Sequence, residues 1–320
     1  MWIPDPEDEA IRDLSRARED AVNSRVQARH QLKGFLLRHD VRYTGKTSWC
    51  GAYYRWLGTL NFGAGAAQTA FTEYWQAVTA ADDRVDRLTK ALQASIAGWR
   101  FEPVVGALQA LRGVAAITAI GLVAEIGDLE RFAHPRKLMG YLGLTPSEHS
   151  SGERTSRGSI TKTGNSHARR LLTEAAWNYR FKARICKQAQ MRQQNLSEPI
   201  RRMAWTAQLR LTQRYAALNA RGLQANKTCI AVARELAGFV CSALAIWAGA
   251  RRGWPETVNT GITFFVIFLY TKFFDWWWDA LPKYLFFLVL GLAAVLILLV
   301  LRRLRGVLAH AGRVGDGGGP

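Results

Sequence analysis

The stretch FTEYWQAVTAADDRVDRLTKALQASIAGW, residues 71–99, places apolar side chains three to four positions apart along its whole length. These apolar positions are Phe71, Trp75, Val78, Val85, Leu88, Leu92, Ile96 and Trp99. The spacing matches the helical repeat of about 3.6 residues and leaves a charged face opposite the apolar one. The stretch therefore predicts a long amphipathic helix whose apolar side needs a partner.

The partner is expected earlier in the chain, in residues 5–39, which are rich in Ala, Arg, Glu and Leu. Its apolar side consists of Ile11, Leu14, Ala21, Ala28, Leu32 and Leu36. Residues 41–65 combine glycines with aromatic residues and predict an irregular connection. Two long helices so joined predict an antiparallel hairpin or a coiled coil through which the chain forms a homo-oligomer. A helix pair in a globular core is the alternative, and the charged outer face favours the hairpin. We assign residues 1–102 to this segment.

Residues 103–250 are predicted to form a compact, mainly helical domain. At its start, the LRGVA stretch at 111–115 resembles the turn of a helix–hairpin–helix, in which backbone N–H groups near Gly113 would bind a phosphate. Ala115 replaces the usual second glycine, and a packed helix pair with a small-residue contact explains the stretch equally well. Residues 165–250 are helical by composition, with one break at Pro199 and helix ends expected near Gly222 and Gly249.

Small, hydroxyl-bearing and cationic residues alternate between residues 150 and 170. Glycines there let the backbone approach a ligand closely, and backbone N–H groups at a helix start bind anions. The candidate phosphate-binding side chains are Arg154, Arg157, Lys162, Asn165, Arg169 and Arg170. Lysine and arginine supply the point charges and forks that phosphate oxygens accept. A serine in such a pocket could attack a phosphodiester, and a solvated basic loop is the alternative.

The charge balance indicates a nucleic-acid partner. The chain carries a formal net charge of +18 at pH 7. Between Ser151 and Arg214 there are 14 Lys and Arg residues against 3 Asp and Glu residues. The aromatic residues Trp177, Tyr179, Phe181 and Trp205 are interleaved with them. A strip this basic would neutralise several phosphates and make binding salt-dependent. A merely soluble cationic surface or a contact with anionic lipids is the alternative.

Residues 108–180 carry an ordered series of motifs that resembles the C-terminal transposase domain of the one-ten insertion-sequence family, which comprises bridge-RNA-guided recombinases. The motifs are LRGV at 111–114, AEIGD at 124–128, LMGYLGLTP at 138–146, SG at 151–152, ITKTGN at 160–165 and RRLL at 169–172. The beginning of the chain, through residue 39, also resembles the segment between the two domains of the family. The resemblance covers most of residues 1–250.

The resemblance implies that the chain binds DNA and a guide RNA. It makes Ser151 the nucleophile, because this residue fills the Ser-Gly position after the Gly-Leu-Thr-Pro turn, with Ser150 and Ser159 as fallbacks. Full members of the family also have an RuvC-like half whose acidic residues hold metal ions. Here Met1 falls inside the interdomain segment, so we expect a truncated transposase that retains nucleic-acid affinity and is inactive alone. No cofactor is expected in this chain. Mg²⁺ is expected to bind only when the acidic half is present.

Residues 251–320 differ in character from the rest of the chain. Residues 257–271 and 284–301 are uncharged runs, and the second is long enough, or nearly so, to cross a hydrocarbon core of about 30 Å. Arginines flank the pair, and a tryptophan-rich turn separates the runs. This pattern predicts a transmembrane helical hairpin over 257–301 with both ends cytoplasmic. A buried core hairpin is the alternative. The tail also resembles the end of bacterial polytopic membrane proteins of unknown function.

Together these features predict a mainly α chain with three parts: the helical hairpin or coiled coil, the compact DNA-binding transposase domain and the transmembrane hairpin. The chain would be anchored in the inner membrane with its N-terminal domain in the cytoplasm, or cytoplasmic if the tail does not insert. Two further functions remain open from the sequence. One is a membrane-anchored nucleic-acid-binding protein without catalysis. The other is a non-functional product of an insertion into a membrane-protein gene.

Overall fold

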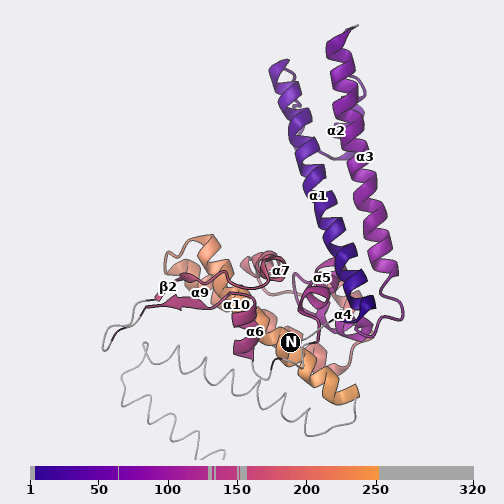
Figure 1. The fold of residues 1–320 in the computed structure, drawn as a ribbon. Helices are drawn as coiled ribbons and strands as arrows, with labels where there is room; N and C mark the ends of the chain where they lie inside the picture. Colours follow the sequence, from indigo (N-terminus) through magenta and orange to yellow (C-terminus); the bar gives the residue numbers. More distant parts are fainter. Residues whose placement is uncertain are drawn as a thin grey trace, which may run out of the picture. The chain divides into compact units, whose positions relative to one another are not determined.

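The computed structural model describes residues 4–63, 65–128, 132, 135–149, 151 and 157–251. The helices are α1 (Pro6–Arg38), α2 (Gly51–Leu57), α3 (Ala66–Ala94), α4 (Glu102–Leu108), α5 (Ala116–Ile126), α6 (Pro135–Tyr141), α7 (Ser166–Ala176), α8 (Lys187–Gln193), α9 (Glu198–Ala220) and α10 (Ala225–Arg251). A 3-10 helix, η2 (Trp177–Arg180), follows α7, and two short strands, β1 (Pro146–Glu148) and β2 (Arg157–Ile160), form an antiparallel pair. The predicted mainly α class is confirmed (Figure 1).

Helices α1 and α3 lie side by side and form the predicted hairpin (Figure 1). Asp8 near the start of α1 accepts a hydrogen bond of 2.8 Å from the Trp99 indole, beyond the end of α3. Farther along α1, Arg29 forms an ion pair of 2.6 Å with Asp82 of α3. The start of α1 thus lies beside the end of the hairpin's second half, and a later part of α1 lies beside an earlier part of α3. The two helices therefore run antiparallel. Self-association through this hairpin stays a prediction.

The second helix of the hairpin ends earlier than its apolar pattern predicts. The periodicity continues to Trp99, but α3 ends at Ala94 and Ser95 caps it. Gly98 then takes a left-handed conformation with φ +84°, which a helix cannot continue through. The turn carries Trp99 onto α1, where the ring is only 2% exposed. The apolar spacing up to Trp99 therefore reflects burial against α1 after the helix has ended.

The connection between the two long helices contains a helix, contrary to the prediction of an irregular segment. Tyr53 and Leu57, four residues apart on α2, are buried in a cluster with Phe35 of α1 and Phe71 of α3. The guanidinium of Arg29 lies 4.9 Å from the centroid of the Trp49 ring beside this cluster. Burial of these rings stabilises a short helix, which the glycine content of the connection did not predict.

The remaining helices pack around α5, α7 and α10. Helix α5 contacts α1, α4 and α7, and α10 contacts α4, α6, α7 and α9. Glu235 of α10 is buried. Its carboxylate forms ion pairs with two arginines of α9, at 3.4 Å from Nε of Arg210 and 3.2 Å from Nε of Arg214. As predicted, one helix ends near Gly222, since α9 stops at Ala220, and a break precedes Pro199, between α8 and α9. The further break between η2 and α8 was not predicted. Pro199 lies in the first turn of α9, where its missing N–H costs nothing.

The predicted membrane hairpin at 257–301 lies outside the described residues. Among the helices that are described, none combines the length and the apolar character needed to cross a bilayer.

Candidate functional site

Strands β1 and β2 form a hairpin that carries the predicted nucleophile. Pro146 pairs with Ile160 and Glu148 with Arg157, and the register shifts between these two pairs. Ser151 follows β1 on the chain segment that joins the two strands, and it is exposed. The hairpin therefore presents the Ser151 hydroxyl to solvent.

The base of this hairpin is fixed by two close backbone approaches. A Cβ at Gly143 would overlap the backbone of Thr163, and a Cβ at Gly164 would overlap the carbonyl of Tyr141. Both glycines have positive φ, +61° and +74°. The Lys162 N–H donates to the Gly143 carbonyl at 3.2 Å. Only glycine fits at these two positions, so the glycine-rich sequence is required by the turn itself.

Arg169 fastens the same base from α7. One guanidinium nitrogen, Nη1, donates to the Leu142 carbonyl at 2.8 Å and to the Thr163 carbonyl at 3.1 Å. These carbonyls lie on the two chain segments that enter and leave the hairpin. Arg169, predicted to contact phosphate, thus has a structural role in joining the two segments.

Arg170, the next residue of α7, forms ion pairs with two carboxylates and does not contact the base of the hairpin through them. It pairs with Glu174 at 2.5 Å and with Glu19 of α1. The Nδ1 atom of His167 lies 2.9 Å from the same Glu19 carboxylate. Arg170 therefore links α7 to α1, and 42% of its side chain remains exposed.

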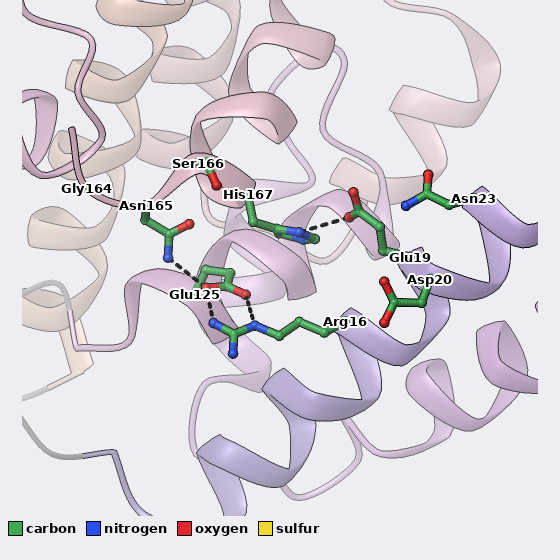
Figure 2. A pocket seen from close by; sticks show the side chains of 9 residues that line it. All are labelled: Arg16, Glu19, Asp20, Asn23, Glu125, Gly164, Asn165, Ser166 and His167. Carbon is green, nitrogen blue, oxygen red and sulfur yellow. Dashed lines mark hydrogen bonds and ion pairs between the residues drawn. The ribbon is translucent and has the colours of Figure 1, made fainter. Parts of the chain in front are cut away.

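The Glu125 carboxylate, at the end of α5, joins three helices. Arg16 of α1 donates to it through Nε at 2.8 Å and Nη2 at 3.1 Å. Asn165 donates to it through Nδ2 at 2.7 Å, while its own Oδ1 accepts from the Ala168 N–H at 2.9 Å and so caps α7. Figure 2 shows Arg16 and Asn165 converging on Glu125. Asn165, predicted to bind nucleic acid, is thus a helix cap held in place by a buried carboxylate.

The environment of Glu125 keeps this carboxylate ionised. Burial by itself raises the pKa, but the hydrogen bonds from Arg16 and Asn165, together with the charges of Arg16 and His167, hold the pKa of Glu125 below the ordinary value of 4.5. The side chain is 1% exposed and that of Arg16 is 51% exposed. An unpaired carboxylate at this position would be costly, so the pair is needed for the arrangement of α1, α5 and α7.

A pocket of about 490 Å³ opens beside Glu125, between α1 and the start of α7 (Figure 2). It is lined by Arg16, Glu19, Asp20, Asn23, Glu125, Gly164, Asn165, Ser166 and His167. Ser151 is not among these residues. Within the described ranges, no three His, Cys, Asp or Glu side chains are grouped so that they could hold a metal ion. The pocket is therefore lined by polar and charged side chains, and the predicted nucleophile is not one of them.

The other predicted site residues occupy different environments. Ser159 lies in β2, and Lys162 follows this strand; both are exposed. Ser150, Arg154 and the side chain of Arg157 lie outside what the structure describes. For these residues the roles in binding and catalysis stay predictions.

Gly113 has a packing role that the sequence left open. Its φ is +83°, and a Cβ there would overlap the carbonyl oxygen of Ala175 at the end of α7. The turn between α4 and α5 therefore lies directly against α7. This favours the packed helix pair as the reason for the glycine, and phosphate binding by the turn stays a prediction.

The sequence reasoning missed Glu125, Arg16 and His167. A signal was present, because Glu125 is the single charged residue in the apolar helix α5. A charged residue in such a stretch is either exposed or paired inside the fold. Its partners, however, are more than one hundred residues earlier in α1 and forty residues later at Asn165, and no local pattern indicates them.

Comparison with known proteins agrees with the motif pattern. Residues 105–193 match the model of the transposase IS116/IS110/IS902 family. The chain is 45% identical over 257 residues, 80% of its length and 61% of the relative, to the putative transposase y4qE of Sinorhizobium fredii. It is 28% identical over 216 residues, 67% of its length and 62% of the relative, to the transposase for insertion sequence element IS1533 of Leptospira borgpetersenii. Residues 105–193 are thus similar to the transposase domain of this family, and the chain spans about three fifths of the length of these two relatives.

Replacing Glu125 by Gln should destabilise the fold, because it removes the charge of a buried carboxylate that is paired with Arg16. We expect a loss of roughly 1–3 kcal/mol in the free energy of unfolding at pH 7. Because the folded pKa of Glu125 is lowered, its contribution is complete above the ordinary value of 4.5 and is lost as the pH falls through the folded pKa. The difference between the two proteins should therefore shrink in acid. Urea unfolding at several pH values measures it.

Glu174→Gln is the matched control, since this carboxylate on α7 is paired with Arg170 but is 58% exposed. Its loss should be within about 0.5 kcal/mol of zero. Equal losses in the two variants, or a difference that does not change with pH, would contradict the role assigned to Glu125.

Proposed function

We propose that this chain works as an insertion-sequence transposase, in which residues 103–250 bind nucleic-acid phosphates and Ser151 is the nucleophile. The observation that carries the proposal is the hairpin of β1 and β2. It exposes Ser151, and its base is fastened by the two glycine contacts and by Arg169. A reactive group on a rigid support can be held close to a scissile bond, which removes much of the entropic barrier.

Lys162 is the described cation best suited to assist at this hairpin. It is exposed, and its backbone takes a left-handed conformation with φ +57°, which is unusual for a residue with a side chain. Such a conformation is kept where the surroundings demand it, and it is frequent at functional sites. The Lys162 ammonium would attract a phosphodiester to the hairpin from its base.

The proposed chemistry is an exchange of phosphodiester bonds. The Ser151 oxygen forms a bond to phosphorus while the bond from phosphorus to the departing DNA oxygen breaks. The serine proton passes to a base, and the departing oxygen gains a proton. A DNA hydroxyl that later attacks the phosphoserine reverses these steps and releases the serine. A serine hydroxyl is a weak nucleophile and needs activation.

The family resemblance assigns this activation to metal ions on an acidic RuvC-like half. The described residues of this chain do not fit such ions, because they contain no suitable group of ligands. We therefore assign no step of the exchange to a metal here. We propose instead that strand transfer requires an acidic half in addition to residues 1–250, and that these residues bind nucleic acid without recombining it on their own.

Removing the Lys162 charge should weaken binding to DNA or structured RNA without changing the fold. A plot of log affinity against log salt concentration has a negative slope. In Lys162→Ala this slope should become less steep by about 0.9, as expected for one lost phosphate contact. Fluorescence anisotropy over a salt series measures the slope. Arg42→Ala is the control, because this side chain is 74% exposed but lies in the helical hairpin outside residues 103–250.

The salt series also separates Lys162 from the arginines of α7. Arg169→Ala should lower both the affinity and the melting temperature, because the guanidinium fastens the hairpin base. Salt-independent binding, or no binding even at low salt, would contradict phosphate recognition by this domain.

Covalent trapping tests the nucleophile. The full chain is mixed with the acidic half of a complete relative, as a separate polypeptide, and with DNA containing the insertion junction. Adducts between protein and DNA should form on denaturing gels and vanish in Ser151→Ala. Ser159→Ala, an exposed serine on β2, should retain them.

Adducts that survive in Ser151→Ala but vanish in Ser159→Ala would move the nucleophile to Ser159. Salt-sensitive binding without adducts in any mixture would favour the second function, a nucleic-acid-binding protein without catalysis. Strand exchange by the unaided chain would contradict the need for an acidic half.

We also propose that residues 257–301 insert into the inner membrane as a helical hairpin and leave the N-terminal domain in the cytoplasm. The support is the sequence alone: two uncharged runs with arginines on their outer sides. Reporter fusions after Gly249 and after Arg305 should both report a cytoplasmic position, and one near Asp279 an external position. Recovery of the full chain in the soluble fraction without detergent would contradict insertion.

A further inference from the structure

The segment from Trp177 to Lys187, here called the cationic–aromatic segment, presents charge and aromatic surface together. Its exposed cations are Arg180, Lys182, Arg184 and Lys187. No Asp or Glu occurs in the sequence between Glu174 and Glu198, so the positive charge is not diluted along the chain. Glu198 itself pairs with Arg201 and Arg202 of its own helix. The segment is therefore a strongly cationic stretch of surface.

Phe181 gives this surface an aromatic ring. The side chain is 51% exposed, and Ile185 four residues later is 48% exposed. The guanidinium carbon of Arg180 lies 4.6 Å from the centroid of the Phe181 ring and 5.6 Å from that of Trp177. Arginine next to aromatic rings is a combination that accepts the flat face of a base as well as a phosphate.

Side chains from two other elements bond the backbone of the segment. Arg112, from the turn between α4 and α5, donates to the Lys182 carbonyl at 2.8 Å and to the Phe181 carbonyl at 3.4 Å. Gln208 of α9, itself buried, donates to the Arg184 carbonyl at 2.7 Å. Because these carbonyls are bonded on the protein side, the backbone between η2 and α8 is held in a non-helical course before any ligand binds. Such preorganisation reduces the entropy lost on binding.

We propose that the cationic–aromatic segment binds an unpaired strand of nucleic acid, with a base stacked on Phe181 and phosphates bound by Lys182, Arg184 and Lys187. The proposal rests on the nucleic-acid binding proposed above and adds the class of ligand. In a duplex the base faces are covered by their neighbours, so only an unpaired base can stack on an exposed ring. Duplex binding would use the cations and leave the Phe181 ring without a function.

A protein partner fits this surface less well. Docking of an apolar surface over Phe181 and Ile185 would remove water from the four neighbouring cations, which is costly unless each finds a carboxylate. A nucleic-acid strand supplies one phosphate for every base, which matches the alternation of cationic and apolar residues from Arg180 to Ile185.

The test compares three labelled ligands of the same length with the full chain at low salt: oligo(dT), oligo(U) and a DNA duplex. A length of about 20 nucleotides exceeds the site sizes of about 4–16 known for single-strand binding folds. Phe181→Leu removes the ring and keeps the apolar character. It should raise the Kd for both single strands about tenfold and change that for the duplex less than about twofold. The two single strands show whether unpaired DNA, unpaired RNA or both are bound.

Phe181→Trp restores an aromatic ring and should bring the single-strand Kd back to within about twofold of the original protein. Lys182→Ala should weaken all three ligands, because it removes only a phosphate contact. Leu37→Ala, an apolar side chain of α1 that is 61% exposed, should change none of them. Circular dichroism confirms that the variants are folded.

Duplex binding that persists while Phe181→Leu leaves the single strands unaffected would overturn the inference and leave the proposed function intact. The same holds if Phe181→Leu weakens the duplex as much as the single strands, or if the segment proves to dock a protein instead. Absence of binding to all three ligands would overturn both the inference and the nucleic-acid binding on which it rests.

Discussion

A buried carboxylate at the end of α5 determines how α1, α5 and α7 meet. Glu125 is charged, nearly inaccessible and satisfied only by Arg16 of α1 and Asn165 of α7. Removing either partner would leave part of a buried charge without a hydrogen bond, which is among the most costly defects in a folded protein. The helical hairpin and α7 are therefore both tied to one point. Because Asn165 also caps α7, the carboxylate further fixes where that helix begins.

The start of α7 in turn supports the hairpin with Ser151. Asn165 donates its N–H to the Tyr141 carbonyl, Gly164 approaches the same carbonyl, and Arg169 bonds the chain on both sides of the hairpin. The cations around the site thus divide into two groups. Arg169 donates to internal carbonyls through Nη1, and Arg170 pairs with two carboxylates, so part of each guanidinium is engaged within the protein. Lys162 and the cations after η2 are exposed and remain available to a ligand.

The sequence predicted the elements that depend on local patterns. The two long helices follow from apolar spacing, and their antiparallel arrangement follows from the length of the connection between them. The errors arise where distant contacts outweigh local preference. Trp99 continues the helical spacing but lies beyond the helix, because Gly98 turns the chain so that its indole reaches Asp8. The basic motif at 162–170 correctly marks a distinctive loop, but charge alone could not show that Arg169 bonds carbonyls. That role requires Leu142 and Thr163 to be adjacent in space.

The motifs that reveal the family are largely the residues that hold the scaffold. Glu125, Gly143, Gly164, Asn165 and Arg169 all lie in these motifs, and each contacts backbone or another member of the set. Contacts of this kind orient a serine and a phosphate-binding surface, but they do not read bases. Under the proposed nucleic-acid binding, recognition of a particular strand depends on side chains outside the scaffold, where substitution leaves the fold intact. Phe181 and its cationic neighbours meet this condition, since their side chains are exposed while their backbone is fixed by Arg112 and Gln208.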